Sequence, residues 1–265
     1  MLTIGFIGAG HMAQAMMKGW QSLDEVAQLV YSPNSKERVA QALGIQAAPS
    51  LEALFQQSDM VVLAMPPAQL VGVAATIKPL LAQAPQKIIV SVLGGVSLEQ
   101  LQASLGQQSL LVRALPNVNV AVQQGYTAVA FGPELVADIK GAVFGLLAYL
   151  GRADELPETQ FGAVSALAGS GPAFVAGFID DLAQAVTSQG IETDVAYKIA
   201  LQTVNGTVAA LTGQELGAIE FAKTVMTPGG STEAGWAVMQ KQNMAATVAE
   251  IIAATMQKNA EFETI

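Results

Sequence analysis

The sequence is poor in several residue types on which many enzymes depend. It contains no cysteine and a single histidine, and charged residues make up only 12% of its 265 residues. Without cysteine the chain can form no disulfide, thiolate nucleophile or thiolate metal site, so we expect no metal centre and a reducing, cytoplasmic location. Its net charge of −9 argues against nucleic acid as a partner, because clusters of Lys and Arg bind phosphate backbones.

Apolar side chains, by contrast, are abundant. They account for 52% of the chain, which is enough to build sizeable cores and more than one monomer is expected to bury. We therefore expect self-association. The most apolar stretch, Phe161–Val186, contains Pro172, Asp180 and Asp181. Two adjacent acids are costly in a bilayer, so we expect no membrane helix.

Short runs rich in Val, Ile and Leu alternate with helical patterns over the first part of the chain. This alternation predicts a doubly wound parallel sheet of the Rossmann-like class. The predicted strands are Leu2–Ile7, Gln28–Tyr31, Met60–Met65, Lys87–Val92, Leu110–Leu115, Tyr126–Phe131 and Ala148–Ala153, and the helices between them are Met12–Gln21, Ser35–Leu43, Ala68–Leu81, Leu98–Leu105 and Glu134–Leu147.

From about Leu156 the strand pattern stops. Helical patterns then cover Glu158–Ser188, Asp194–Leu211, Leu216–Val225 and Ser231–Phe262. The sequence thus predicts two domains, a dinucleotide-binding domain over residues 1–155 and an all-helical domain over residues 156–265.

A glycine-rich turn follows the first predicted strand. The segment Gly8-Ala9-Gly10-His11-Met12-Ala13 has the G-x-G-x-x-A spacing of a dinucleotide-binding turn that opens a helix. Gly8 permits the tight bend, Gly10 lets a pyrophosphate approach the backbone, and Ala13 lets helix and strand pack closely. His11 is expected to begin this helix beside the phosphates rather than act as a catalytic acid. The alternative is an ordinary glycine-rich turn.

The second predicted strand ends without the acidic residue that usually binds the ribose 2′-hydroxyl of NAD. Hydroxyls, an amide and two cations follow Tyr31 instead: Ser32, Asn34, Ser35, Lys36 and Arg38. These groups suit a 2′-phosphate, so we expect NADP, with NADPH preferred over NADH. The alternative is that Lys36 and Arg38 only form the solvated first turn of a helix. The 2′-phosphate would then rest mainly on Ser32, Asn34 and Ser35.

A second glycine-containing segment links the last two predicted helices, with the sequence Val225-Met226-Thr227-Pro228-Gly229-Gly230-Ser231-Thr232. Gly229 and Gly230 leave backbone N–H groups uncovered, and Ser231 or Thr232 begins a helix. Together they predict a nest that binds a carboxylate without any arginine. The alternative is a plain helix–loop–helix junction in which threonine only caps the helix.

Two more segments complete a pattern. Arg113-Ala114-Leu115-Pro116-Asn117 ends a predicted strand, and Ala168-Gly169-Ser170-Gly171-Pro172-Ala173-Phe174 interrupts a long helical run. With the two glycine segments, they resemble the pyrroline-5-carboxylate reductase family over almost the whole chain, in the same order and at similar spacing. The resemblance implies a helical second domain through which two subunits dimerise and interleave their helices to complete each active site. It also implies NADPH-dependent reduction of 1-pyrroline-5-carboxylate to L-proline, the last step of proline biosynthesis.

The resemblance further implies roles for individual residues. Thr232 would contact the imino nitrogen and is the candidate catalytic residue. The other implied substrate contacts are Glu158, Val225, Thr227, Gly229, Gly230 and Ser231. The expected cofactor contacts, from the resemblance and from the glycine turn and second strand, are Ile7, Gly8, Ala9, Gly10, His11, Met12, Ser32, Asn34, Ser35, Ser50, Ala64, Met65, Pro66, Pro67, Val92, Leu93, Gly94 and Asn117.

Some positions depart from the family pattern. Met65-Pro66-Pro67 stands where the family commonly has Val-Lys-Pro, and Thr224 and Met226 also differ from the usual residues. A reductase for another cyclic imino acid and a non-catalytic NADP-binding regulator are therefore kept as alternatives. A β-hydroxyacid dehydrogenase is disfavoured, because it needs a lysine that residues 158–188 do not contain.

Overall fold

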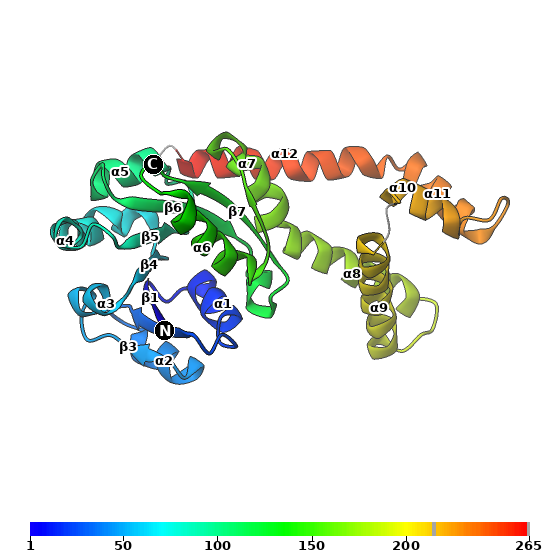
Figure 1. The fold of residues 1–265 in the computed structure, drawn as a ribbon. Helices are drawn as coiled ribbons and strands as arrows, with labels where there is room; N and C mark the ends of the chain where they lie inside the picture. The colour runs from blue at the N-terminus through cyan, green and yellow to red at the C-terminus, as the bar shows by residue number, and fades with distance from the viewer. Residues whose placement is uncertain (214–215, 264–265) are drawn as a thin grey trace. The chain divides into compact units, whose positions relative to one another are not determined.

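The computed structural model describes residues 1–213 and 216–263. They form two compact units (Figure 1). The first contains residues 1–170 and the chain from Thr255 onward, and the second contains Gly171–Ala254. The strands end at Glu155, where the sequence predicts the domain boundary, whereas the compact units divide after Ser170. The functional boundary at residue 155 stays a prediction.

The first unit is built on one sheet, and its described residues give eight strands in the order β3-β2-β1-β4-β5-β6-β7-β8. The strands are β1 (Leu2–Ile7), β2 (Val26–Tyr31), β3 (Gln46–Ala47), β4 (Met60–Leu63), β5 (Ile88–Ser91), β6 (Leu110–Pro116), β7 (Gly125–Phe131) and β8 (Gly151–Glu155). The strand order reverses between β1 and β4, which is the switch point at which doubly wound sheets bind ligands. The structure confirms the predicted doubly wound fold.

Together with β8, strand β7 runs opposite to strands β1–β6. It pairs with β6 in an antiparallel sense, whereas the remaining neighbours are parallel. Residues 117–124 connect β6 to β7, and a parallel crossover needs a dozen or more residues. The connection is therefore too short for β7 to run parallel to β6.

Helices cover both faces of the sheet: α1 (His11–Gly19), α2 (Lys36–Leu43), α3 (Leu51–Gln57), α4 (Leu70–Gln83), α5 (Leu98–Leu105) and α6 (Ala137–Ala148). The central strand β4 is buried along its whole length. Its Met60 and Val62 pack in one core, and its Val61 and Leu63 pack in the other. Successive strand residues point to opposite faces, so one apolar run serves both helical layers.

The predicted helix Glu158–Ser188 is in fact a series of shorter pieces. Glu158–Gln160 forms a 3₁₀ turn, α7 covers Phe161–Val164, a π-helical turn covers Ser165–Gly169, and α8 covers Gly171–Thr187. The predicted helix Ser231–Phe262 is likewise divided into α11 (Ser231–Lys241) and α12 (Met244–Glu263). Asn243 between them has φ 51°, a left-handed conformation that asparagine tolerates better than most residues.

The second unit contains α8, α9 (Thr193–Thr212), α10 (Ala218–Val225), α11 and the first part of α12. Its described residues include one small buried cluster, formed by Ala183, Ala196 and Ala200. Large apolar side chains stay accessible, with Phe178 47% exposed and Tyr197 47% exposed. A unit of this kind has more apolar surface than a monomeric protein normally leaves in water.

The run Glu158–Thr187 is long and apolar enough to cross a membrane by length and composition alone, with a mean hydropathy of 1.5 over a window of 18 residues. It contains Asp180 and Asp181, which disfavour insertion. The absence of a membrane helix stays a prediction.

Candidate functional site

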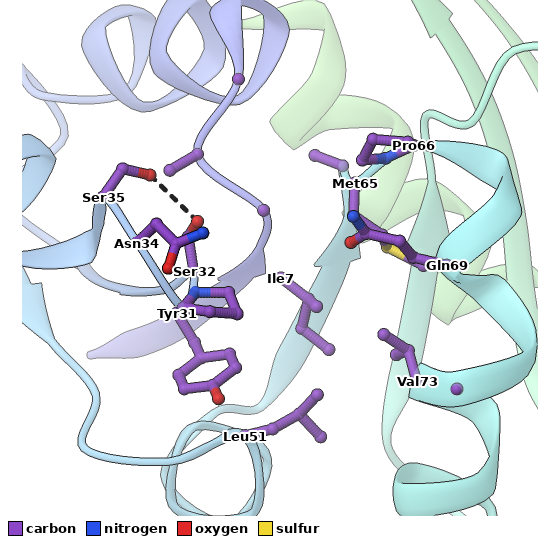
Figure 2. A pocket seen from close by; sticks show the side chains of 16 residues that line it. Ile7, Tyr31, Ser32, Asn34, Ser35, Leu51, Met65, Pro66, Gln69 and Val73 are labelled. Atoms are coloured by element: carbon purple, nitrogen blue, oxygen red, sulfur yellow. Dashed lines mark hydrogen bonds between the residues drawn. The ribbon is translucent and has the colours of Figure 1, made fainter.

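A cavity of about 520 Å³ lies at the carboxyl ends of β1, β2 and β4 (Figure 2). Its walls come from residues 7–10, 31–35 and 64–66, together with Leu51, Gln69, Gly72 and Val73. The cavity therefore lies at the switch point of the sheet, where a dinucleotide is expected.

The two glycines of the turn have different surroundings. Gly8 has φ +108°, and a Cβ atom added there would lie 2.4 Å from the carbonyl oxygen of Ala64. Gly10 has φ −72° and ψ −178°, and a Cβ atom added there would meet nothing within 4 Å. Gly8 is thus required by the fold itself, whereas at Gly10 the fold leaves open space above the backbone. That space is what a pyrophosphate would need.

Helix α1 begins at this turn with a polar end suited to an anion. Gly10 is its N-terminal cap, and within the described residues no side chain caps the helix and no acid lies in its first turn. The first-turn N–H groups and the positive end of the helix dipole are therefore available to a phosphate. These features fit the pyrophosphate of a dinucleotide.

Backbone and side-chain hydrogen bonds hold the turn in place. The Gly8 amide donates to the Tyr31 carbonyl at 2.9 Å, and the Ala64 amide donates to the Ile7 carbonyl at 2.8 Å. The side chain of Gln14 donates to the Ala9 carbonyl at 2.7 Å. Gln14 was not predicted, because the glycine spacing says nothing of the residue that fixes the turn from within the helix.

The segment after β2 presents hydroxyl and amide groups to the cavity. The hydroxyls of Ser32 and Ser35 lie 2.9 Å apart, and Asn34 lies beside them (Figure 2). Among the described residues that line the cavity there is no acidic side chain. This polar group is the expected position for a 2′-phosphate.

The Lys36 ammonium group has partners other than these groups. Its Nζ donates to the Pro49 carbonyl at 3.0 Å and lies 4.9 Å from the centre of the Tyr31 ring. Arg38 is exposed on α2. Of the two alternatives for the 2′-phosphate, the geometry favours the one in which Ser32, Asn34 and Ser35 bind it.

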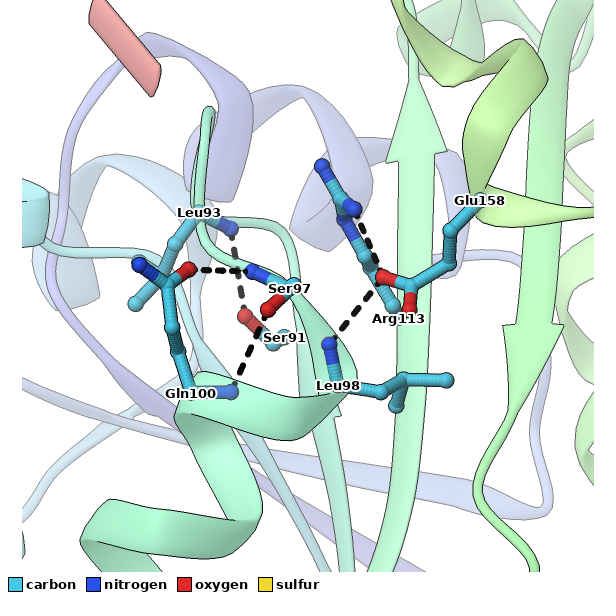
Figure 3. A network of polar contacts seen from close by, with 7 residues as sticks. All are labelled: Ser91, Leu93, Ser97, Leu98, Gln100, Arg113 and Glu158. Carbon is cyan, nitrogen blue, oxygen red and sulfur yellow. Dashed lines mark hydrogen bonds and ion pairs between the residues drawn. The ribbon is translucent and has the colours of Figure 1, made fainter. Parts of the chain in front are cut away.

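A polar network surrounds the loop that leads from β5 to α5 (Figure 3). The Ser97 hydroxyl accepts from the Gln100 amide at 3.2 Å, and the Gln100 side chain accepts from the Ser97 amide at 2.8 Å, which forms a capping box. Glu158 Oε1 accepts from the Leu98 amide at 3.0 Å and from Arg113 Nη1 at 2.6 Å. Arg113 also lies over the Phe161 ring, with 4.7 Å between guanidinium carbon and ring centre.

The predicted substrate loop belongs to the second unit. Helix α10 ends at Val225, and Gly230 is the N-terminal cap of α11, whose first two residues are Ser231 and Thr232. The alternative that threonine caps this helix is therefore wrong: Thr232 lies inside the first turn and is exposed. Gly229, with φ +72°, donates its amide to Glu233 Oε2 at 2.6 Å. A carboxylate from the chain itself thus occupies one N–H group of the predicted nest.

Comparisons with known proteins cover both parts of the chain. Residues 158–262 match a family model described as pyrroline-5-carboxylate reductase dimerisation, and residues 3–95 match one described as NADP oxidoreductase, coenzyme F420-dependent. The pyrroline-5-carboxylate reductase of Aquifex aeolicus is 34% identical over 97% of this chain and 96% of its own. The chain belongs to the pyrroline-5-carboxylate reductase family.

Other relatives agree with this assignment. The pyrroline-5-carboxylate reductase of Escherichia coli is 31% identical over 97% of this chain and 96% of its own. The solved structure of the 1-pyrroline-5-carboxylate reductase from Streptococcus pyogenes superimposes with a TM-score of 0.86 at 29% identity, covering 100% of this chain and 99% of that one. The sequence resemblance to pyrroline-5-carboxylate reductases is confirmed along the whole length of the chain.

In this reductase, many of the expected cofactor residues line the cavity at the switch point. They are Ile7, Gly8, Ala9, Gly10, Ser32, Asn34, Ser35, Ala64, Met65 and Pro66. The cavity wall adds Tyr31, Pro33, Leu51, Gln69, Gly72 and Val73, which sequence reasoning did not identify. Gln69 is the N-terminal cap of α4, and Gly72 and Val73 follow it in the helix at a spacing of three and four residues, which was the available signal.

The remaining expected residues lie outside this cavity. His11 and Met12 begin α1, and Pro67 begins the 3₁₀ turn before α4. Val92, Leu93 and Gly94 form the loop after β5. Their contacts with a cofactor stay predictions.

Ser50 and Asn117 have local structural roles. The Ser50 hydroxyl caps α3 by accepting from the Ala53 amide at 3.1 Å. The side-chain oxygen Oδ1 of Asn117 accepts from the backbone amides of Asn119 and Tyr126, each at 3.2 Å, and its side-chain Nδ2 donates to the Ala168 carbonyl at 3.0 Å. Ser50 thus stabilises the start of α3, and Asn117 fixes the connection after β6, whether or not either residue also contacts a cofactor.

Proposed function

We propose that this chain reduces 1-pyrroline-5-carboxylate to L-proline with NADPH, as the last step of proline biosynthesis. The observation that carries the proposal is the full-length relationship to pyrroline-5-carboxylate reductases, including 34% identity to the Aquifex aeolicus enzyme. The cavity at the switch point adds a physical reason, because its open turn, its uncapped helix end and its lack of an acidic wall fit NADP.

In the proposed reaction, bound NADPH supplies a hydride to the imine carbon, and the ring nitrogen takes up a proton. The protein positions the two reactants. The Gly8–Gly10 turn and the start of α1 hold the pyrophosphate, and Ser32, Asn34 and Ser35 hold the 2′-phosphate. The loop after β5, with Val92, Leu93 and Gly94, borders the nicotinamide half.

The substrate is held by the loop Val225–Thr232. Its backbone N–H groups bind the carboxylate, in the way that the Gly229 amide now binds Glu233. Thr232 donates a hydrogen bond to the imino nitrogen and passes on a proton from water. Once its nitrogen has taken up this proton, the imine is a good electrophile for the hydride, so no stronger acid is required.

Self-association is part of the proposal. The helical unit matches a dimerisation family model and exposes large apolar residues such as Phe174, Phe178 and Tyr197. Burying these side chains between two subunits removes apolar surface from water, which favours association. A cytoplasmic location and the lack of nucleic-acid and membrane partners complete the proposal.

The direct test is to measure NADPH oxidation with pyrroline-5-carboxylate and with its six-membered analogue. We expect the catalytic efficiency to be higher with the five-membered imine. A higher efficiency with the six-membered ring would assign the chain to another cyclic imino acid. Tight NADPH binding without oxidation by either imine would instead identify a non-catalytic NADP-binding protein.

A further inference from the structure

Glu158, which the family resemblance marks as a substrate contact, has a different set of partners in the structure. One of its carboxylate oxygens, Oε1, accepts from Arg113 Nη1 at 2.6 Å and from the Leu98 amide at 3.0 Å. Figure 3 shows this oxygen between the strand that carries Arg113 and the first residue of α5. A single atom therefore ties a strand end to a helix start.

The arginine side of this contact is rigid. Arg113 is 7% exposed and lies in β6, where it pairs in register with Ser91 of β5. Its guanidinium lies against the ring of Phe161, which is 1% exposed. A buried guanidinium needs a carboxylate partner, and Glu158 supplies it. The ion pair thus has little freedom to rearrange.

The other side of the contact is the loop from β5 to α5, residues 92–97. Ser91 fixes its beginning by accepting from the Leu93 amide at 3.4 Å. Glu158 fixes its end through the Leu98 amide, which is one of the N–H groups that a helix start leaves without a backbone partner. Gly95 within the loop has φ +73°, so the loop holds a conformation that depends on these anchors.

The 92–97 loop follows β5, whereas the residues expected to bind the adenosine half of the cofactor, Ser32 and Ser35, follow β2 on the other side of the switch point. A doubly wound sheet binds the two halves of a dinucleotide on either side of its switch point. The cavity with Ser32 and Ser35 lies at the ends of β1, β2 and β4, which leaves the ends of β5 and β6, on the far side of β4, for the nicotinamide half. The loop after β5 therefore borders the place where the hydride is transferred.

We propose that Arg113 and Glu158 are positioning residues that set the conformation of the 92–97 loop and, through it, the placement of the nicotinamide ring. The inference rests on the proposed function for the identity of the cofactor. Glu158 acts through the Leu98 amide and does not contact the substrate. Loss of this anchor lowers turnover by up to about a hundredfold, the effect of a misplacement of about 1 Å between reacting groups.

The test compares two ligands that probe different halves of the site. 2′,5′-ADP contains only the adenosine half, whereas NADPH needs both halves. In Glu158→Ala we expect the affinity for 2′,5′-ADP to stay within about twofold of the unsubstituted protein, as for an independent site. We expect NADPH affinity and kcat to fall. Glu158→Gln keeps an oxygen acceptor and should recover most of both.

A matched control is Asp154→Asn. It removes the carboxylate of another ion pair in the same unit, Arg152–Asp154 at 2.8 Å, whose arginine is exposed and whose aspartate is partly exposed. The pair lies on β8, three strands from β5 in the sheet order. Exposed pairs contribute little, so all three measurements should stay unchanged. Thermal unfolding of each variant shows which ones are folded.

If Glu158→Ala fails to fold because Arg113 is left unpaired, the double variant Arg113→Met/Glu158→Met removes both charges. It should fold and bind 2′,5′-ADP, yet still bind NADPH weakly, because the Leu98 amide still lacks its acceptor. Normal NADPH binding and turnover in either folded variant would overturn the proposal. So would a parallel loss of both ligands, or a rise only in KM for the imine, which would mark Glu158 as a direct substrate contact.

The outcome is separable from that of the proposed function. If the unsubstituted protein binds NADPH but reduces no imine, the two binding measurements still test the anchor. If the unsubstituted protein does not bind NADPH at all, the proposed function fails before any variant is made.

Discussion

The two glycines of the cofactor turn should respond in opposite ways to the same substitution. Gly10 has ordinary extended backbone angles and open space beside its Cα atom, whereas Gly8 has φ +108° and lies against the backbone of Ala64. Gly10→Ala should therefore leave the fold intact and place a methyl group where the pyrophosphate approaches. Gly8→Ala should damage the fold itself.

The expected magnitudes follow from these positions. Gly10→Ala lowers the entropy of the unfolded chain, which stabilises the fold, but alanine is a poorer helix cap than glycine, which destabilises it. The free energy of unfolding should therefore change by less than about 1 kcal/mol. Losing one charge-assisted hydrogen bond to phosphate costs about 1.5–3 kcal/mol, or roughly ten- to more than a hundredfold in Kd. For Gly8→Ala, a left-handed alanine and an overpacked contact together cost roughly 2–5 kcal/mol of unfolding free energy.

Two measurements on each variant separate these effects: denaturant unfolding for stability and calorimetric titration for NADPH affinity. We expect Gly10→Ala to be as stable as the unsubstituted protein and to bind NADPH weakly. We expect Gly8→Ala to be clearly destabilised. A folded Gly10→Ala variant with unchanged NADPH affinity would refute the placement of the pyrophosphate at this turn.

Four further outcomes are expected. In binding titrations, Ser32→Asp should lower the affinity for NADPH by roughly tenfold or more relative to the affinity for NADH, because two like charges 4 Å apart repel by about 1–4 kcal/mol. An unchanged ratio of the two affinities would remove Ser32 from the 2′-phosphate site. Thr232→Ala should lower kcat by roughly ten- to a thousandfold in steady-state assays. Its thermal stability should be nearly unchanged because Gly230, and not Thr232, caps α11. Thr232→Ser should restore turnover, and normal turnover in the folded Ala variant would exclude Thr232 from the mechanism. Sedimentation at micromolar concentration should show at least a dimer, and a folded, active monomer would contradict this. Burial lowers the pKa of Lys87, and the charge of Asp59 only partly offsets this by raising it. Just below the ordinary lysine pKa the unfolded state therefore binds more protons than the folded state, so the free energy of unfolding should rise with pH in that window. Denaturation measured as a function of pH should show this rise, and Lys87→Met should abolish it.

The parts of the fold that the sequence predicted well are those encoded locally. β1, the glycine turn and α1 follow from apolar alternation, special backbone angles and helix periodicity within Leu2–Gly19. The predicted cofactor residues near this turn converge on one cavity, because parallel strands place their carboxyl ends at one edge of the sheet.

Other features were not predicted, each for a different reason. Helix α3 was missed because its seven residues are too few to show a clear period, although Ser50 at its start is a typical helix cap. The antiparallel direction of β7 follows from the short connection 117–124 and not from its own residues. The contact of Glu158 with Arg113 joins residues far apart in the sequence, so only the folded chain reveals it.

The most direct measurement follows the product and the cofactor together. Purified protein is mixed with NADPH and pyrroline-5-carboxylate, and both the loss of NADPH absorbance and the formation of proline are recorded. A reductase of this kind should form one proline for each NADPH oxidised, with a higher catalytic efficiency than with NADH. No proline formation by a folded, NADPH-binding protein would contradict the proposed reaction.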